Sequence, residues 1–259
     1  MNILAIGAHP DDIELGCGGT LIKAAQLGHN IFMYVLTRGE ASGDPVERTK
    51  EAMAAAAFIG ARTLWVDNFE DANLTVCREL VSRIEYFIDQ SKADLVFTHS
   101  ENDYHHDHRA AAEATLEAGR YSRNIVAYEI PVTKRFSPGG YYDISDVIEK
   151  KTELIRLFES QRDKLFTNEK AIRGLSNYRA FQSRLSTHLD AVESFEVVRI
   201  CFSPNFELMK REREPTGPIL SRPMDLSALV TYVPKGLTAR NAPADQSSAE
   251  FLEDIIEGS

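Results

Sequence analysis

Cysteine is scarce in this 259-residue sequence, and its three cysteines, Cys17, Cys77 and Cys201, follow no recognisable spacing. They form no CxxC pair and no zinc-ribbon pattern, and an odd number of cysteines cannot pair completely within one chain. These absences exclude a disulfide framework and a cysteine-based zinc site as organising features of the fold. They favour a protein that works in a reducing compartment.

Long apolar runs are also missing. No stretch approaches the ~20 residues that span a bilayer, and the amino-terminal NILAIGAHP lacks the basic segment of a signal peptide. The formal net charge of −10 argues against a nucleic-acid partner or an anionic membrane surface. It does not forbid a small anionic substrate held by a few arginines. We therefore expect a cytoplasmic protein without a transmembrane segment, whose partner is a small molecule.

What the sequence does have is a hydrophobic content of 43%, enough for a substantial core, and an alternation of apolar runs with helical patterns. Strands are expected at 2–8, 30–37, 62–66, 94–98, 125–130 and 195–202, and helices at about 18–28, 46–59, 74–91, 107–119, 145–163 and within 169–190. The near-continuous hydrophobic strands are typical of a sheet covered on both faces. This order predicts an α/β fold: a Rossmann-like, doubly wound, mostly parallel sheet with additional carboxyl-terminal helices and a strand.

The second half of the chain departs from this alternation. Residues 131–143 carry turn-forming Pro and Gly and are expected to form a loop, and Ser145 is a candidate N-cap for the helix after it. Residues 204–259 turn charged, proline-bearing and weakly periodic from about residue 211, and they end in the acidic AEFLEDIIEGS. We expect them to be an extension, partly disordered or packed on a neighbour, beyond a domain formed by residues 1–203.

Two polar clusters follow strands that a Rossmann-like sheet places side by side. HPDD (9–12) follows the first strand, and HHDH (105–108) comes shortly after the fourth, whose last residues lead into His99. In a sheet ordered 3-2-1-4, the first and fourth strands are neighbours, and the crevice at their carboxyl ends is the topological switch point. We expect His99 to be hydrogen-bonded beside the site or part of the core. The side chains expected to face one another are His9, Asp11, Asp12, His105, Asp107 and His108.

This combination of residue types suits a catalytic metal ion. Catalytic zinc takes three protein ligands of nitrogen or oxygen type and leaves one position open. His9 and Asp12 can supply two ligands, and a histidine of the second cluster the third. Asp11 then remains free to take a proton from water. A histidine three residues before the third ligand could polarise a carbonyl or protonate a leaving group. The clusters would then contain the Lewis acid, the base and the acid that a hydrolase uses.

Other interpretations compete with this one. The aspartates of HPDD could merely cap the following helix, in a nucleotide-binding or regulatory module without catalytic activity. The glycine-rich GCGG (16–19) does not match GxGxxG and lies too far behind the strand for a dinucleotide site. Its amides could bind substrate oxygens, or its glycines could serve close packing. The occurrence of both clusters at adjacent strand ends favours the hydrolytic interpretation.

AHPDDIELGCGGTL (8–21) together with HHDHRAA (105–111) resembles the LmbE/PIG-L family of zinc-dependent N-deacetylases. The likeness extends over about residues 1–203, with ESQ (159–161) and AVESFEVVR (191–199) among the supporting segments. It implies a Rossmann-like deacetylase domain that removes an acetyl group from an N-acetylglucosamine-type amino sugar or its conjugate. Related members cleave a larger amide in a glucosaminyl thiol conjugate. The implied cofactor is Zn²⁺, with Fe²⁺ or another divalent metal left open, as is the choice between monomer, dimer and hexamer.

Carried over residue by residue, the resemblance makes His9, Asp12 and His108 the metal ligands and Asp11 the general base. Water activated by the metal would then attack the acetyl carbonyl and release acetate and the free amine.

The same comparison assigns the remaining site residues. His105 becomes the group that stabilises the oxyanion or protonates the departing amine, and Asp107 would orient His105 and keep it charged. Arg48 matches an arginine that holds the polar end of the substrate. Some relatives place a tyrosine two residues before the histidine motif, where this sequence has Asp103, with Tyr104 next. Assistance by a tyrosine therefore stays open.

Overall fold

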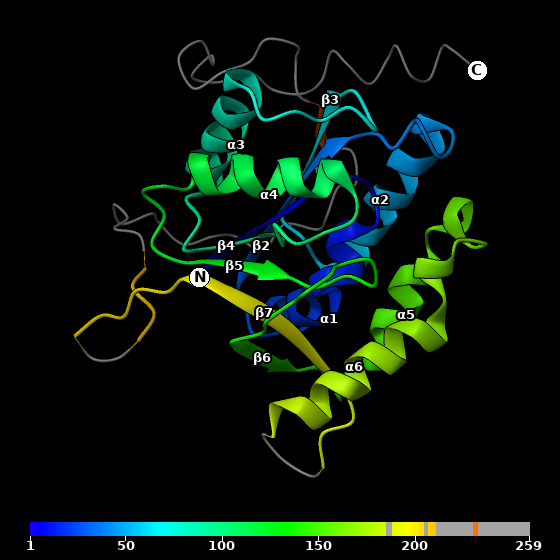
Figure 1. Ribbon diagram of the computed structural model, residues 1–259, viewed down its shortest axis with the longest axis vertical. Helices are drawn as coiled ribbons and strands as arrows, with labels where there is room; N and C mark the ends of the chain where they lie inside the picture. Colours follow the sequence, from blue (N-terminus) through cyan, green and yellow to red (C-terminus); the bar gives the residue numbers. More distant parts are fainter. Residues whose placement is uncertain (185–187, 205–206, 211–229, 233–259) are drawn as a thin grey trace.

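A single mixed sheet forms the centre of the computed structural model, which describes residues 1–184, 188–204, 207–210 and 230–232 (Figure 1). Its strand order is β6-β7-β5-β4-β1-β2-β3-β8. The strands are β1 (Asn2–Gly7), β2 (Asn30–Thr37), β3 (Thr63–Phe69), β4 (Leu95–His99), β5 (Ile125–Tyr128), β6 (Gly140–Asp143), β7 (Val192–Arg199) and β8 (Val230–Tyr232). Most of the extension predicted at 204–259 lies outside the described residues.

The parallel part of the sheet confirms the predicted fold class and the order 3-2-1-4. β1 pairs in parallel with both β2 and β4, and Ile3 lies opposite Ile31 on one side and Leu95 on the other. β3 and β5 extend the parallel sheet outward from these strands. The carboxyl ends of β1 and β4 are therefore neighbours, as the facing of the two polar clusters requires.

Helices cover both faces of the sheet, as a doubly wound fold requires. They are α1 (Asp12–Gln26), α2 (Pro45–Ile59), α3 (Arg78–Ser91), α4 (His106–Ala118), α5 (Ile148–Arg156) and α6 (Glu169–Ser183). α3 and α4 lie together on one face, while α1, α2 and α5 pack on the other (Figure 1). Within the described residues, no helix combines the length and the apolar character needed to cross a membrane.

The second half of the chain differs from the prediction in two elements. The end of the predicted 131–143 loop forms β6, which pairs antiparallel with β7 and so gains backbone hydrogen bonds that its short, glycine-led sequence did not signal. The helix predicted at 145–163 is shorter, because the chain leaves α5 after Arg156 and forms 3₁₀ turns at Glu159–Gln161 and Leu165–Thr167. Ser145 does not cap the helix, because its hydroxyl donates to Asp143 Oδ1 at 2.7 Å.

The glycine-rich segment lies inside α1, which begins six residues earlier than the predicted start at 18. The helix is interrupted at Cys17, where φ is −138°. This break leaves the N–H groups of Gly19 and Thr20 without intrahelical acceptors, and both donate to the carboxylate of Glu193, at 2.9 and 2.7 Å. Lys151 neutralises the same carboxylate at 2.5 Å. The amides of this segment therefore bind a protein carboxylate, which favours the packing interpretation.

Candidate metal and active site

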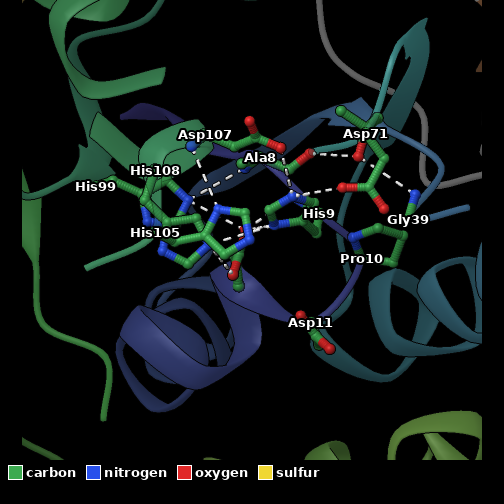
Figure 2. A network of polar contacts seen from close by, with 12 residues as sticks. Ala8, His9, Pro10, Asp11, Gly39, Asp71, His99, His105, Asp107 and His108 are labelled. Atoms are coloured by element: carbon green, nitrogen blue, oxygen red, sulfur yellow. Dashed lines mark hydrogen bonds and ion pairs between the residues drawn. The ribbon is translucent and has the colours of Figure 1, made fainter. Parts of the chain in front are cut away.

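The two polar clusters meet at the carboxyl edge of the sheet. HPDD connects β1 to α1, and HHDH forms the first turn of α4, with His105 as its N-cap. Figure 2 shows the imidazoles of His9, His105 and His108 gathered at one point. They border a cavity of about 300 Å³, which is large enough for a monosaccharide-sized ligand.

Three of the side chains converge with the spacing of a metal site. His108 Nε2 lies 3.2 Å from His9 Nδ1 and 3.3 Å from Asp12 Oδ1, and His9 Nδ1 lies 3.3 Å from Asp12 Oδ2. Ligand atoms about 2.0–2.1 Å from a tetrahedral zinc ion are about 3.3 Å from one another. The predicted ligand set of two imidazoles and one carboxylate therefore fits a divalent cation in both chemistry and separation.

Each of these two imidazoles has a carboxylate on its other ring nitrogen. His9 Nε2 lies 3.0 Å from Asp107 Oδ2 and 3.0 Å from Asp71 Oδ1, and His108 Nδ1 lies 3.2 Å from Asp103 Oδ1. Metal-binding histidines ordinarily have such a carboxylate partner, which holds the ring in place. Its presence on both rings is a second feature of a metal site.

Asp107 contacts a different histidine from the one predicted. Its carboxylate accepts the backbone N–H groups of Ala72 and Leu74 at 2.8 and 2.9 Å and faces His9 Nε2, whereas His105 meets only its backbone, where His105 Nδ1 accepts the Asp107 N–H at 3.3 Å. The reason is the helix geometry, because the Asp107 side chain leaves the first turn of α4 toward the loop after β3. The hydrogen-bonding contacts of the Asp107 carboxylate are thus with His9 and the loop after β3, and its predicted action on His105 stays a prediction.

The electrostatics of the cluster favour opposite charges on Asp12 and the imidazoles. Burial on its own raises the pKa of Asp12, but the imidazoles of His108 and His99 outweigh it and hold that pKa well below its usual range. Burial likewise lowers the pKa of His108, but the carboxylates of Asp12 and Asp103 raise it to about 9. The carboxylate of Asp12 and the imidazole of His108 thus stabilise each other's charged forms.

Asp11 occupies a separate position beside the same cavity. It lies apart from the imidazoles (Figure 2), it is 3% exposed, and its backbone has a φ of 108°, which L-residues rarely adopt. Burial and the neighbouring charge of Asp12 raise its pKa to about 7, although Arg48 opposes the shift. A carboxylate with this pKa can exchange a proton at neutral pH.

Arg48 holds this strained turn in place. Its Nη2 donates to the Pro10 carbonyl oxygen at 2.7 Å and to Asp11 Oδ2 at 3.1 Å, while its Nη1 donates to the carbonyl oxygen of Gly39 at 3.0 Å and to Ser42 Oγ. Arg48 is 2% exposed, and protein groups occupy both of its terminal nitrogens, while its Nε has no hydrogen-bond partner among the described residues. These contacts make Arg48 part of the turn that carries Asp11, and its role in holding the polar end of the substrate stays a prediction.

His105 stands at the edge of the cavity. Its ring centroid lies 4.8 Å from that of His9 and 4.6 Å from that of His108, so its imidazole borders the predicted metal position. Tyr104 is 73% exposed and does not line the cavity, and Asp103 supports His108 from the position where some relatives carry tyrosine. The structure therefore offers His105, and no tyrosine from this loop, beside the reacting position.

Asp71 was not among the predicted site residues, and His99 was expected only beside the site or in the core. Asp71 follows β3 in the sequence FEDAN, and the only signal for it is that this loop shares the carboxyl edge of the sheet with the other clusters. His99 accepts the Ala8 N–H at 3.1 Å, lies 3.1 Å from Asp12 Oδ2, and stacks on His108 with centroids 4.1 Å apart. His99 thus has the hydrogen-bonded position beside the site that was expected of it.

This chain is similar to known proteins in a family pattern, in sequence and in structure. Residues 4–119 match the family model described as PIG-L: GlcNAc-PI de-N-acetylase. The uncharacterized deacetylase YaiS of Escherichia coli is 38% identical over 138 residues, which cover 51% of this chain and 75% of the relative. A diacetylchitobiose deacetylase of Thermococcus kodakarensis is 29% identical over 185 residues, which cover 61% of this chain and 69% of the relative.

Among solved structures, GalB, the 4-carboxy-2-hydroxymuconate hydratase of Pseudomonas putida, superposes with a TM-score of 0.69 at 20% identity, covering 80% of this chain and all of the other. At this identity the likeness concerns the fold, and the neighbour's different activity shows that the fold alone does not determine the reaction. The sequence relationships are more specific. They show that the chain belongs to the PIG-L/LmbE family, whose model is described as a de-N-acetylase.

Proposed function

We propose that this protein is a divalent-metal-dependent N-deacetylase that hydrolyses the acetamido group of an N-acetylglucosamine-type amino sugar or its conjugate. The observation that carries the proposal is the convergence of His9 Nδ1, Asp12 and His108 Nε2 at 3.2–3.3 Å beside a cavity of about 300 Å³. The family match and the deacetylase names of the relatives support the same reaction class.

His9, Asp12 and His108 are the residues that would hold the cation, and zinc is the proposed ion, with Fe²⁺ as the alternative. When bound, such a cation supplies a Lewis acid for the acetyl carbonyl and makes water more acidic. Asp107 and Asp71 position the imidazole of His9, and Asp103 positions that of His108.

Asp11 is the proposed general base. It accepts a proton from the attacking water, a role that suits its pKa of about 7 in the metal-free form. Arg48 is a positioning residue in this scheme, because it fixes Asp11 Oδ2 and the Pro10 carbonyl oxygen together. The strained φ of Asp11 is stabilised by these bonds.

His105 is the proposed acid. It lies beside the imidazoles of His9 and His108 at the edge of the cavity, where it can donate a proton to the amine nitrogen as the carbon–nitrogen bond breaks. The balanced reaction consumes one water molecule and yields acetate and the free amine. Burial and the charges of His108 and His9 lower the pKa of His105, so its protonated form is a stronger acid but a minor species at neutral pH, and the neutral ring can instead stabilise the oxyanion by donating a hydrogen bond.

The test is a screen that measures both the free amine and acetate, run across N-acetylglucosamine, its phosphorylated and glycosidic conjugates, and a cysteinyl-glucosamine amide, whose cleavage releases the amine without acetate. Each substrate is assayed with the metal-loaded protein, with the chelated protein, and with the chelated protein after zinc is restored. Acetate release that requires the metal supports the proposal. Cleavage of the cysteinyl amide alone would instead indicate the thiol-conjugate amidase.

Two results would overturn the enzymatic assignment. The first is protein that binds no divalent ion, and the second is turnover that is indifferent to the chelator. A non-catalytic, nucleotide-binding or regulatory module would behave in this way.

A further inference from the structure

One wall of the cavity has no part in the proposed chemistry. It is formed by the segment from Glu159 to Thr167, which contains both 3₁₀ turns and which we call the 159–167 turn. Gln161, Lys164 and Phe166 of this turn line the cavity together with the imidazoles. The turn therefore contacts whatever occupies the space next to the reacting position.

The turn is anchored to α2 in a way that fixes Gln161. The carboxylate of Glu51 accepts the Ser160 N–H at 2.8 Å and the Ser160 hydroxyl at 2.6 Å. The Gln161 amide nitrogen in turn donates to the Ser42 carbonyl oxygen at 3.3 Å and to Ser160 Oγ at 3.0 Å. Because a carbonyl cannot donate, the bond to Ser42 determines which end of the carboxamide is nitrogen.

This orientation leaves Gln161 Oε1 as a buried acceptor. Gln161 is 1% exposed, and its Oε1 has no hydrogen-bond partner in the described part of the chain. A buried carbonyl oxygen without a partner destabilises the folded protein, and a ligand in the cavity that donates a hydrogen bond to Oε1 would remove this penalty. Sugar hydroxyls are donors of this kind.

Lys164 adds a positive charge to the same wall. It is exposed, and among the described residues its ammonium group makes no ion pair, whereas the two terminal nitrogens of Arg48, also at the cavity, are occupied by protein groups. Phe166, two residues later, adds an apolar side chain to the lining of the cavity. The wall thus combines a buried acceptor, an exposed cation and an apolar side chain.

We propose that the 159–167 turn selects the substrate: Gln161 Oε1 accepts a hydrogen bond from a hydroxyl of the sugar ring, and Lys164 binds an anionic substituent, phosphate or carboxylate, carried by the sugar. This inference rests on the proposed deacetylase function and narrows its substrate to an anionic conjugate. The cationic side chain explains how a protein with a net charge of −10 can accept such a ligand.

The charge is tested with neutral and anionic substrates in parallel. kcat/KM is measured for methyl N-acetylglucosaminide, N-acetylglucosamine 1-phosphate and a carboxyalkyl N-acetylglucosaminide, using the wild type, Lys164→Gln and the matched control Arg162→Gln. Arg162 is exposed, lies two residues away and does not line the cavity. We expect Lys164→Gln to lower kcat/KM about fivefold for the anionic substrates only, and high salt to reduce this difference. Equal effects of K164Q on neutral and anionic substrates, or the same loss in R162Q, would overturn the role of Lys164.

The acceptor is tested with the 3-, 4- and 6-deoxy analogues of the preferred substrate. In the wild type, removal of the hydroxyl that faces Gln161 should lower kcat/KM about three- to tenfold. In Gln161→Met this particular penalty should disappear, because the acceptor is gone, while the other deoxy penalties persist. If Gln161 has a purely structural role, Gln161→Met will lower kcat/KM for all substrates by the same factor and leave every deoxy penalty unchanged. This result would refute the proposal.

A binding measurement separates this inference from the enzymatic proposal. Calorimetric titration with N-acetylglucosamine 1-phosphate and with its neutral methyl glycoside compares the wild type with K164Q without requiring turnover. Absence of acetate release with a charge-dependent binding difference would refute the deacetylase function and retain the selecting turn. Normal deacetylation with no charge preference in either binding or turnover would refute the selecting turn alone.

Discussion

The two sides of the HPDD turn differ sharply, although they are separated by one peptide bond. Asp12 faces the imidazoles of His9, His99 and His108, which hold its pKa well below the usual range. Asp11 faces the Arg48 guanidinium, yet burial and the charge of Asp12 raise its pKa to about 7. Both side chains are 3% exposed, so the extent of burial does not explain the difference.

The comparison shows how one turn can supply two different carboxylates. On the imidazole side, the carboxylate is kept ionised and fits a cation. On the guanidinium side, the carboxylate can take up and release a proton near neutral pH. Environments that separate the pKa values of neighbouring carboxyl groups are a recurring way to divide catalytic roles between them. The left-handed backbone at Asp11 sends the two side chains in different directions.

Removal of a ligand on the imidazole side is expected to have the largest effect. His108→Ala deletes one of the proposed ligands and removes the imidazole that lowers the pKa of Asp12 most. Bound metal should fall from stoichiometric to near zero by elemental analysis, and acetate release should fall to background. His106→Ala is the matched control, because His106 is half exposed and its imidazole contacts Asp107 Oδ1 and stacks on His105 but is not a proposed ligand. Stoichiometric metal in H108A would contradict the proposed ligand set.

Substitution on the guanidinium side should separate catalysis from metal binding. Asp11→Asn keeps the size of the side chain but removes the proton acceptor, so kcat should fall about 10²- to 10⁴-fold. Metal content should stay at the wild-type level, because Asp11 is not part of the imidazole cluster. If D11N keeps its turnover, or if it loses its bound metal, the proposed distinction between the two aspartates is wrong.

A third substitution tests which histidine depends on the Asp107 carboxylate. Asp107→Asn weakens the support of His9, so metal affinity should fall about 10- to 100-fold, as expected for a carboxylate behind a histidine ligand. Competition with a chromophoric chelator measures this affinity. If D107N instead binds metal normally and only loses activity, the carboxylate acts through His105 as the sequence predicted.

A further prediction concerns pH. The pKa of His108 is about 9, because Asp12 and Asp103 overcome the opposing effect of burial, and the pKa of His9 is also raised, because the carboxylates of Asp107, Asp12 and Asp71 outweigh burial. A cation needs both imidazoles neutral, so its binding must release the proton of each ring that is protonated. Apparent metal affinity should therefore rise from pH 6 toward pH 9, by about tenfold per pH unit for each ring that still carries a proton, and then level off. Calorimetry in buffers with different ionisation enthalpies counts the protons, and a pH-independent affinity would contradict the assigned charge state.

The sequence predicted the part of the site that depends on local spacing and strand order. HPDD and HHDH are short motifs at the ends of β1 and β4, and the doubly wound topology makes those strands neighbours. The partners that lie far away could not be predicted in the same way. Asp71 comes from an irregular loop after β3, and Arg48 binds the backbone carbonyls of Pro10 and Gly39, which any sequence would carry.

The secondary structure also divides into elements that the sequence predicted and elements that it did not. The observed bounds of the long hydrophobic strands lie close to the predicted ones, because burial on both faces leaves a continuous apolar pattern. β6 was missed because four residues beginning with glycine carry little pattern of their own and depend on pairing with β7. The early start of α1 was missed because HPDD reads as a loop, while the glycines that follow are held in the helix by Glu193.

The two carboxylates behind His9 fix more than the position of its ring. Asp71 and Asp107 both lie 3.0 Å from Nε2, and neither can donate a proton when ionised, so Nε2 must keep its hydrogen. When the ring becomes neutral, the proton leaves from Nδ1, the atom that faces His108 and Asp12. The lone pair thus appears on the side of the proposed cation without any rotation of the ring, and binding or release of that cation would leave the tautomer unchanged.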